Sequence, residues 1–91
     1  MIFGRSDDWL AARAGDEIMM MNATRGTYLG LNAMGARIWD LLAEPREIEW
    51  LCGQLVREFE VSEPVCRSEV QTFLDELIKH KAIVVLAAPR T

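Results

Sequence analysis

The sequence lacks any long apolar segment. No apolar run approaches the roughly 20 residues that a membrane-spanning helix needs. The first residues, Met1–Arg5, have neither the basic start nor the long apolar stretch of a signal peptide. From these two absences we expect a cytoplasmic protein that makes no contact with a membrane.

Basic residues are also too few and too scattered to form a nucleic-acid-binding surface. Ten Lys and Arg stand against fourteen Asp and Glu, which gives a net charge of -4. Because neutralising phosphates supplies much of the affinity for nucleic acid, we expect no nucleic-acid partner. The one basic cluster, Lys79–Lys81, lies at the end of a predicted helix, where cations complement the helix dipole.

Cysteine and histidine are scarce, with two Cys and one His in the chain. Cys52, Cys66 and His80 cannot complete an ordinary four-ligand zinc site, and the two cysteines do not have a short metal-ligand spacing. Cys66 and His80 would be about 21 Å apart along a straight helix, too far for a nucleophile and its base. We therefore predict no metal, no cofactor and no catalytic residue, and expect both cysteines in the core.

The stretch Gly26–Leu42 changes its hydrophobic period at Asn32. Before Asn32, Leu29 and Leu31 alternate with other residues, which is typical of a half-buried strand. After it, the apolar residues fall on one face of a helix. The short side chain of Asn32 can accept a hydrogen bond from a free amide of the first helical turn. This stretch predicts a strand that leads directly into a helix capped by Asn32.

Three strands are predicted, over residues 9–13, 17–22 and 27–31, after a loose arm over residues 1–8. Two tight turns join them, which predicts an antiparallel meander in sequence order. The second strand has four apolar residues in a row, Ile18–Met21, so we expect it to be central with both faces at least partly covered.

The third predicted strand then lies at an edge of the sheet. Edge strands expose unpaired amides and carbonyls, and proteins usually protect them with charge, proline or a covering element. Thr27–Leu31 contains neither charge nor proline. Such an uncovered edge also leaves homodimerisation open.

Three helices are predicted after the strands, over residues 33–43, 47–59 and 63–81. Ser62 can cap the third, which is the longest amphipathic stretch. Residues 83–86 are apolar and either add a short strand or pack back on the core. We therefore predict one α+β domain over residues 1–91, related to winged helix-turn-helix modules, with a three-stranded antiparallel sheet followed by three helices.

Two segments of this pattern also point to a family. The motif Tyr-Leu-Gly-Leu-Asn over residues 28–32, followed by Gly-Ala-Arg-Ile-Trp-Asp-Leu-Leu over 35–42, resembles the PqqD-like proteins. So does the later pattern of Glu69-Val70, Phe73-Leu74 and Leu77. These proteins are peptide-recognition domains of pathways that make ribosomally synthesised and post-translationally modified peptides. The resemblance covers about residues 9–86.

The resemblance implies a non-enzymatic escort. Family members bind the N-terminal leader of a precursor peptide, which adds as a strand to the third strand and lies in a groove between that strand and the third helix. The enzyme partners implied are the leader peptidase and the ATP-dependent cyclase of a lasso-peptide pathway. The alternative within the family is a partner of a radical peptide-modifying enzyme. A DNA-binding winged helix is a further alternative, which the topology permits and the acidity opposes.

The resemblance also implies which residues bind the peptide. Four come from the third strand and four from the third helix: Thr27, Tyr28, Leu29, Gly30, Glu69, Val70, Phe73 and Leu77. Each has a structural alternative. Phe73 and Leu77 are more typical of the core than of a groove, Tyr28 can simply cover the sheet, and Glu69 can be a solvated helix position.

Overall fold

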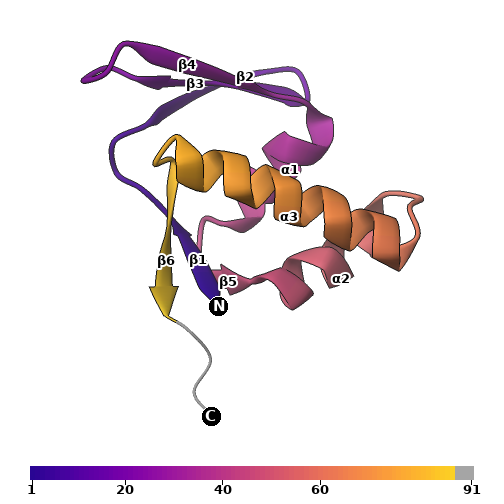
Figure 1. The fold of residues 1–91 in the computed structure, drawn as a ribbon. Helices are drawn as coiled ribbons and strands as arrows, with labels where there is room; N and C mark the ends of the chain where they lie inside the picture. Colours follow the sequence, from indigo (N-terminus) through magenta and orange to yellow (C-terminus); the bar gives the residue numbers. More distant parts are fainter. Residues whose placement is uncertain (88–91) are drawn as a thin grey trace.

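The computed structural model describes residues 1–87. Along the chain, six strands and three helices follow one another (Figure 1). Their bounds are β1 Ile2–Arg5, β2 Leu10–Ala14, β3 Glu17–Asn22, β4 Thr27–Leu31, α1 Ala33–Leu41, β5 Arg46–Glu47, α2 Ile48–Glu58, α3 Glu63–Lys79 and β6 Ile83–Ala87.

The β2–β3–β4 sheet is the predicted meander. Its strands are antiparallel and lie in sequence order, which places β3 in the centre and confirms that prediction. Ile18 and Met20 on β3 are buried, whereas Met19 between them is 51% exposed. Met21, also on the outer face, is half-buried, so this face of the strand is covered only in part, because only the other face of the sheet packs against the helices.

A second sheet was not predicted. The segment expected to be a loose arm forms β1, which pairs with β5 on one side and β6 on the other. Phe3 in β1 is only 3% exposed. The prediction of a loose arm over residues 1–8 is wrong because both partners of β1 come from distant parts of the chain, where local sequence patterns give no signal. Residues 83–86 form most of β6, one of the two alternatives left open.

The three predicted helices are confirmed within a few residues at each end. Asn32 caps α1, because its side-chain oxygen accepts a hydrogen bond from the backbone N–H of Gly35 at 2.9 Å. Ser62 stands at the N-cap position of α3 and Pro64 lies in the first turn, where a missing N–H costs little. The expected α+β class, with a three-stranded antiparallel sheet followed by three helices, is confirmed.

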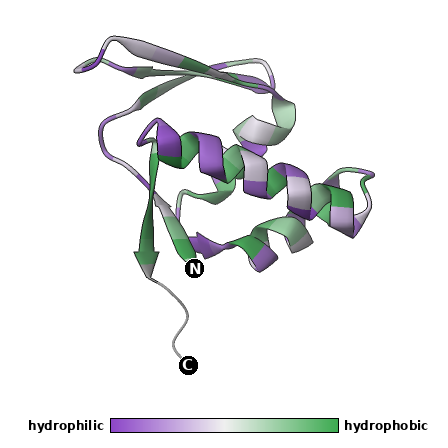
Figure 2. Cartoon of the chain, in the orientation of Figure 1, coloured by the Kyte–Doolittle hydropathy of each residue, from purple (hydrophilic) through white to green (hydrophobic). Residues whose placement is uncertain are grey.

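The helices lie on the inner face of the β2–β3–β4 sheet (Figure 1). α1 packs against β3 and β4, and α2 packs against α3. Hydrophobic and hydrophilic residues alternate along α3, as expected of a helix with one face in the core (Figure 2). Fully buried side chains from both sheets and all three helices form the core, among them Met20, Ile38, Leu51, Leu74 and Ile83.

Within residues 1–87, no helix is long and apolar enough to cross a membrane. The same residues hold no cluster of three or more His, Cys, Asp or Glu side chains that could bind a metal ion.

Candidate functional site

The free edge of β4 is the first part of the site. β4 pairs with β3 on one side, and within residues 1–87 no strand pairs with its other side. Leu29 and Leu31 point to the inner face, opposite Met20 and Ile18 of β3. Tyr28, which is 65% exposed, belongs to the outer face. The edge therefore offers a row of backbone groups with no charged side chain beside them.

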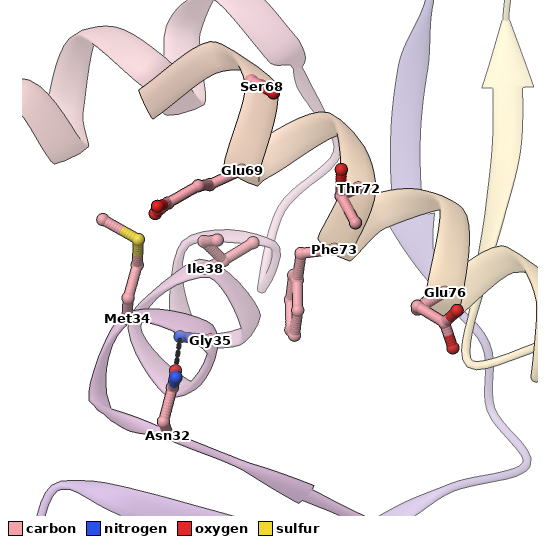
Figure 3. Close-up of a pocket in the computed structure, with 9 residues that line it drawn as sticks. All are labelled: Asn32, Met34, Gly35, Ile38, Ser68, Glu69, Thr72, Phe73 and Glu76. Carbon is pink, nitrogen blue, oxygen red and sulfur yellow. Dashed lines mark hydrogen bonds between the residues drawn. The ribbon is translucent and has the colours of Figure 1, made fainter. Parts of the chain in front are cut away.

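A groove between α1 and α3 begins where β4 ends. Its volume is about 380 Å³, and Asn32, the first residue after β4, is part of its wall. The remaining lining residues come from the two helices (Figure 3). They are Met34, Gly35 and Ile38 of α1, and Ser68, Glu69, Thr72, Phe73 and Glu76 of α3.

The Phe73 ring lies close to Gly35 across this groove. A Cβ atom on Gly35 would lie only 2.9 Å from Cε1 of the Phe73 ring, closer than real Cβ atoms come to carbon. The ring points from α3 towards α1 and is half-buried (Figure 3). Glycine at position 35 therefore lets the aromatic ring lie against the backbone of α1 and form an apolar floor.

The wall supplied by α3 is a single face of that helix. Thr72 and Phe73 lie three and four residues after Glu69, and Glu76 lies four and three residues after them, which places all four on one face of the helix. Figure 3 shows the side chain of Glu69 extending towards Met34 on the opposite wall. Glu76 lies further along α3, with its carboxylate 3.6 Å from Nε2 of His80.

The structure brings only some of the predicted residues together. Glu69 and Phe73 line the groove, and Thr27–Gly30 form the free edge beside it. Val70 is completely buried and Leu77 is 1% exposed, so both side chains belong to the core and face away from the groove. Their assignment to a peptide-binding surface needs this correction, since the helical spacing of apolar residues does not distinguish a groove wall from the core beneath it.

Sequence analysis missed the α1 wall of the groove. Met34, Gly35 and Ile38 line it together with Thr72 and Glu76 of α3. A signal was available for α3, because positions 72 and 76 continue the face that starts at Glu69. Gly35 is the first residue of the second motif segment, so the sequence shows a glycine there. Its contact with Phe73 could not be predicted, because the two residues lie far apart in the sequence.

Ion pairs hold the surrounding elements in place. Arg13 of β2 donates two hydrogen bonds of 2.6 Å to Asp40 of α1. Arg37 of α1 pairs with Glu58 at the end of α2, with Nε 2.6 Å from Oε1. The hydrogen bond from Arg37 lowers the pKa of the Glu58 carboxyl below its ordinary value. None of these four side chains is part of the groove lining.

The two cysteines lie in the core, as expected. Cys66 is fully buried and Cys52 is 5% exposed. Burial raises the pKa of both thiols, which disfavours the nucleophilic thiolate. The acid paired with His80 is Glu76 of α3, and His80 is the residue that follows this helix. These observations disfavour a thiol enzyme built on Cys66 and His80.

Comparisons with known proteins agree with this geometry. The family model of coenzyme PQQ synthesis protein D (PqqD) matches residues 17–83. A solved structure described as TbiB1 in complex with the TbiA(beta) leader peptide is 30% identical to this chain, with a TM-score of 0.83. The similarity covers 93% of this chain and 99% of that one.

A second structure, described as lasso peptide synthetase B1 complexed with the leader peptide, has the same fold. Its TM-score is 0.80 at 17% identity, over 91% of this chain and 98% of that one. No curated protein sequence matches significantly. The family model spans most of the chain, from the central strand of the sheet to the start of β6. This chain is therefore a member of the PqqD family.

Proposed function

We propose that this protein binds the leader segment of a ribosomally made precursor peptide and presents it to a modifying enzyme. The leader adds as an extended strand to the free edge of β4 and places a side chain in the groove between α1 and α3. The main observation behind this proposal is the position of the groove, which begins at Asn32 directly after an edge strand without charge. Two similar structures are described as leader-peptide complexes, which supports this proposal.

Strand addition supplies the affinity that does not depend on sequence. Unpaired N–H and C=O groups of β4 form main-chain hydrogen bonds with an extended peptide. β4 is uncharged, and its own residues Tyr28 and Gly30 are exposed on the outer face of the sheet. No side chain of this strand therefore has to move before a peptide can pair with it.

The groove supplies selectivity. An extended peptide directs alternate side chains to one face, so one or two of them can enter a pocket beside the edge. Met34, Ile38 and Phe73 give this pocket an apolar interior, with Phe73 as the aromatic contact. We infer that Thr27–Gly30 contribute mainly backbone, and that Phe73 and Glu69 are the side chains that touch the peptide.

We infer a role without catalysis. The chain escorts its peptide to a separate enzyme, for which the leader peptidase and cyclase of a lasso-peptide pathway are the proposed partners. The lasso assignment draws support from the second similar structure, which is described as a lasso peptide synthetase B1. A PqqD-type partnership with a radical peptide-modifying enzyme is the alternative within the family. For either role, we infer that the protein acts in the cytoplasm.

A direct titration tests the proposal. A fluorescently labelled leader from a precursor gene next to the gene of this chain is titrated with the protein at low and high salt. We expect saturable binding that persists at high salt, because main-chain hydrogen bonds and apolar burial dominate. Absence of binding to every neighbouring leader, together with salt-sensitive binding to duplex DNA, would contradict the proposal and favour the winged-helix alternative.

A further inference from the structure

The groove between α1 and α3 has carboxylates at its rim and no basic side chain in its lining. Glu69 and Glu76 are its two charged residues, and the other seven lining residues are neutral. Both glutamates are exposed. Among the ion pairs found within residues 1–87, Glu69 takes part in none, and Glu76 pairs only with His80, which directly follows α3.

The two carboxylates lie on either side of the apolar floor. Glu69 is four residues before Phe73, a rise of about 6 Å along the helix, and Glu76 is three residues after it, a rise of about 4.5 Å. Side chains on one face of an extended peptide recur about every 6.6 Å. A peptide that runs along α3 with one side chain over Phe73 therefore brings its next side chain on that face close to Glu69 or Glu76. β4 and α3 both run across the view in Figure 1, which fits this arrangement.

Building on the proposed function, we propose that the bound peptide has a Lys or Arg two residues from the apolar side chain that contacts Phe73. Glu69 binds this cation, and Glu76 offers the second carboxylate when the basic residue lies on the other side of the apolar one. Charge complementarity carries this assignment, because the lining presents two negative charges and no positive charge to whatever enters. An acidic side chain at the same place would meet repulsion from both.

The free carboxylate of Glu69 is the better partner of the two. It extends over the groove towards Met34, where a long basic side chain can cover the methionine with its methylene groups while its charge reaches the carboxylate (Figure 3). Glu76 already has His80 nearby at 3.6 Å, so its gain from a new cation is smaller when that histidine is protonated.

A library of short random peptides displayed on phage tests this proposal without requiring the natural ligand. The library is selected against the wild-type protein and against Glu69→Gln, with Asp75→Asn as the matched control. Asp75 is on the same helix, is exposed and bonds Gln71 away from the groove, so both variants lose one negative charge from α3. One selected peptide is then resynthesised with its basic residue changed to norleucine or Glu.

We expect the wild type and Asp75→Asn to enrich Lys or Arg two residues from an apolar residue, and Glu69→Gln to lose this enrichment. For the resynthesised peptide, Glu69→Gln should weaken binding about fivefold at low salt and less at high salt, as for a partly exposed ion pair. Glu69→Lys should reverse the preference, so that the Glu-bearing peptide binds better than the Lys-bearing one.

Two failures are distinguishable. The NMR signals of the β4 amides show whether a selected peptide binds at this strand. If these signals shift but the Lys, norleucine and Glu versions of the peptide bind equally, the inference about charge is overturned and the peptide-binding function stands. If no selected peptide perturbs β4, both the inference and the proposed function are overturned.

Discussion

The two edges of the β2–β3–β4 sheet both offer unpaired backbone groups but lie beside different surroundings. β2 and β4 each pair only with β3 within the described residues, and both expose most of their side chains. β4 leads into the apolar groove at Asn32. β2 has Arg13, which is bonded to Asp40 in a hollow of about 260 Å³ whose lining also includes the charged residues Asp16 and Arg37.

In the proposed function, an open edge is only half of the peptide-binding site. Backbone hydrogen bonds are available at both edges, but the groove between α1 and α3, with Phe73 as its floor, is lined by the residue that follows β4 and by no residue of β2. The packing of α1 against β3 and β4 creates the asymmetry. We therefore expect changes in the β4 surroundings to alter peptide binding, and matched changes near β2 to alter stability alone.

The largest effect is expected for Phe73→Ala. Loss of the ring removes the apolar floor, and the leader should bind at least about tenfold more weakly, the equivalent of about 1.5 kcal/mol of lost apolar contact. The free energy of unfolding should fall by less than the roughly 3–5 kcal/mol of a fully buried Phe, because this ring is half-buried. Fluorescence titration and urea denaturation measure the two quantities.

Phe59→Ala is the matched control. Phe59 is also half-buried against the core, but it lines the hollow beside Arg13 on the β2 side. The Phe59→Ala variant should lose unfolding free energy to a degree similar to Phe73→Ala and keep its affinity for the leader. Equal losses of affinity in both variants would mean that Phe73 acts through stability and is a core residue only.

Gly35→Ala should have the second largest effect. The new methyl group would lie 2.9 Å from the Phe73 ring, so the ring has to move into the groove. Overpacking of this kind costs about 1–3 kcal/mol of unfolding free energy, and a displaced ring should also weaken leader binding severalfold. Gly53→Ala in α2 is the control, because no atom lies within 4 Å of its new Cβ. The control should be neutral or stabilised by up to about 1 kcal/mol.

Gly30→Glu tests the edge itself with a smaller expected effect. A Cβ at Gly30 meets only Cε of Met19 at 3.8 Å, so the variant should fold normally. Its carboxylate would lie on the outer face of the sheet, next to the peptide residue that pairs with position 30. This charge should weaken peptide binding up to about fivefold. Ala12 lies in the same row of the sheet on β2, opposite Met19. Ala12→Glu therefore places the same charge at the other edge and should leave affinity unchanged.

The smallest effect is expected for Arg13→Gln on β2. Its ion pair with Asp40 is about half exposed on the arginine side, and such pairs contribute at most about 1 kcal/mol to stability. Leader affinity should be unaffected at any salt concentration. A clear loss of affinity in this variant would place the peptide at the β2 edge and contradict the comparison.

Local sequence patterns predicted the elements that depend on local chemistry. The change of period at Asn32 and its short side chain predicted both the strand end and the helix cap, and the structure has the cap hydrogen bond at 2.9 Å. The two tight connections predicted the order of the meander, and hence the free edge of β4.

Features that depend on distant parts of the chain could not be predicted in this way. β1 gains its pairing from β5 and β6, so Ile2 and Phe3 have no local pattern of a strand. Val70 and Glu69 are neighbours in sequence, but one side chain enters the core and the other the groove, and only the position of α1 decides which face is which.

Amide hydrogen exchange, measured residue by residue by NMR, tests the central claim most directly. Rates are compared for the free protein and for the protein saturated with its leader peptide. We expect the outward N–H groups of β4 to exchange at least about tenfold more slowly in the complex, because they become hydrogen-bonded, while rates in β2 stay the same. Unchanged exchange in β4 while the peptide is bound, or protection that appears in β2 instead, would contradict strand addition at β4.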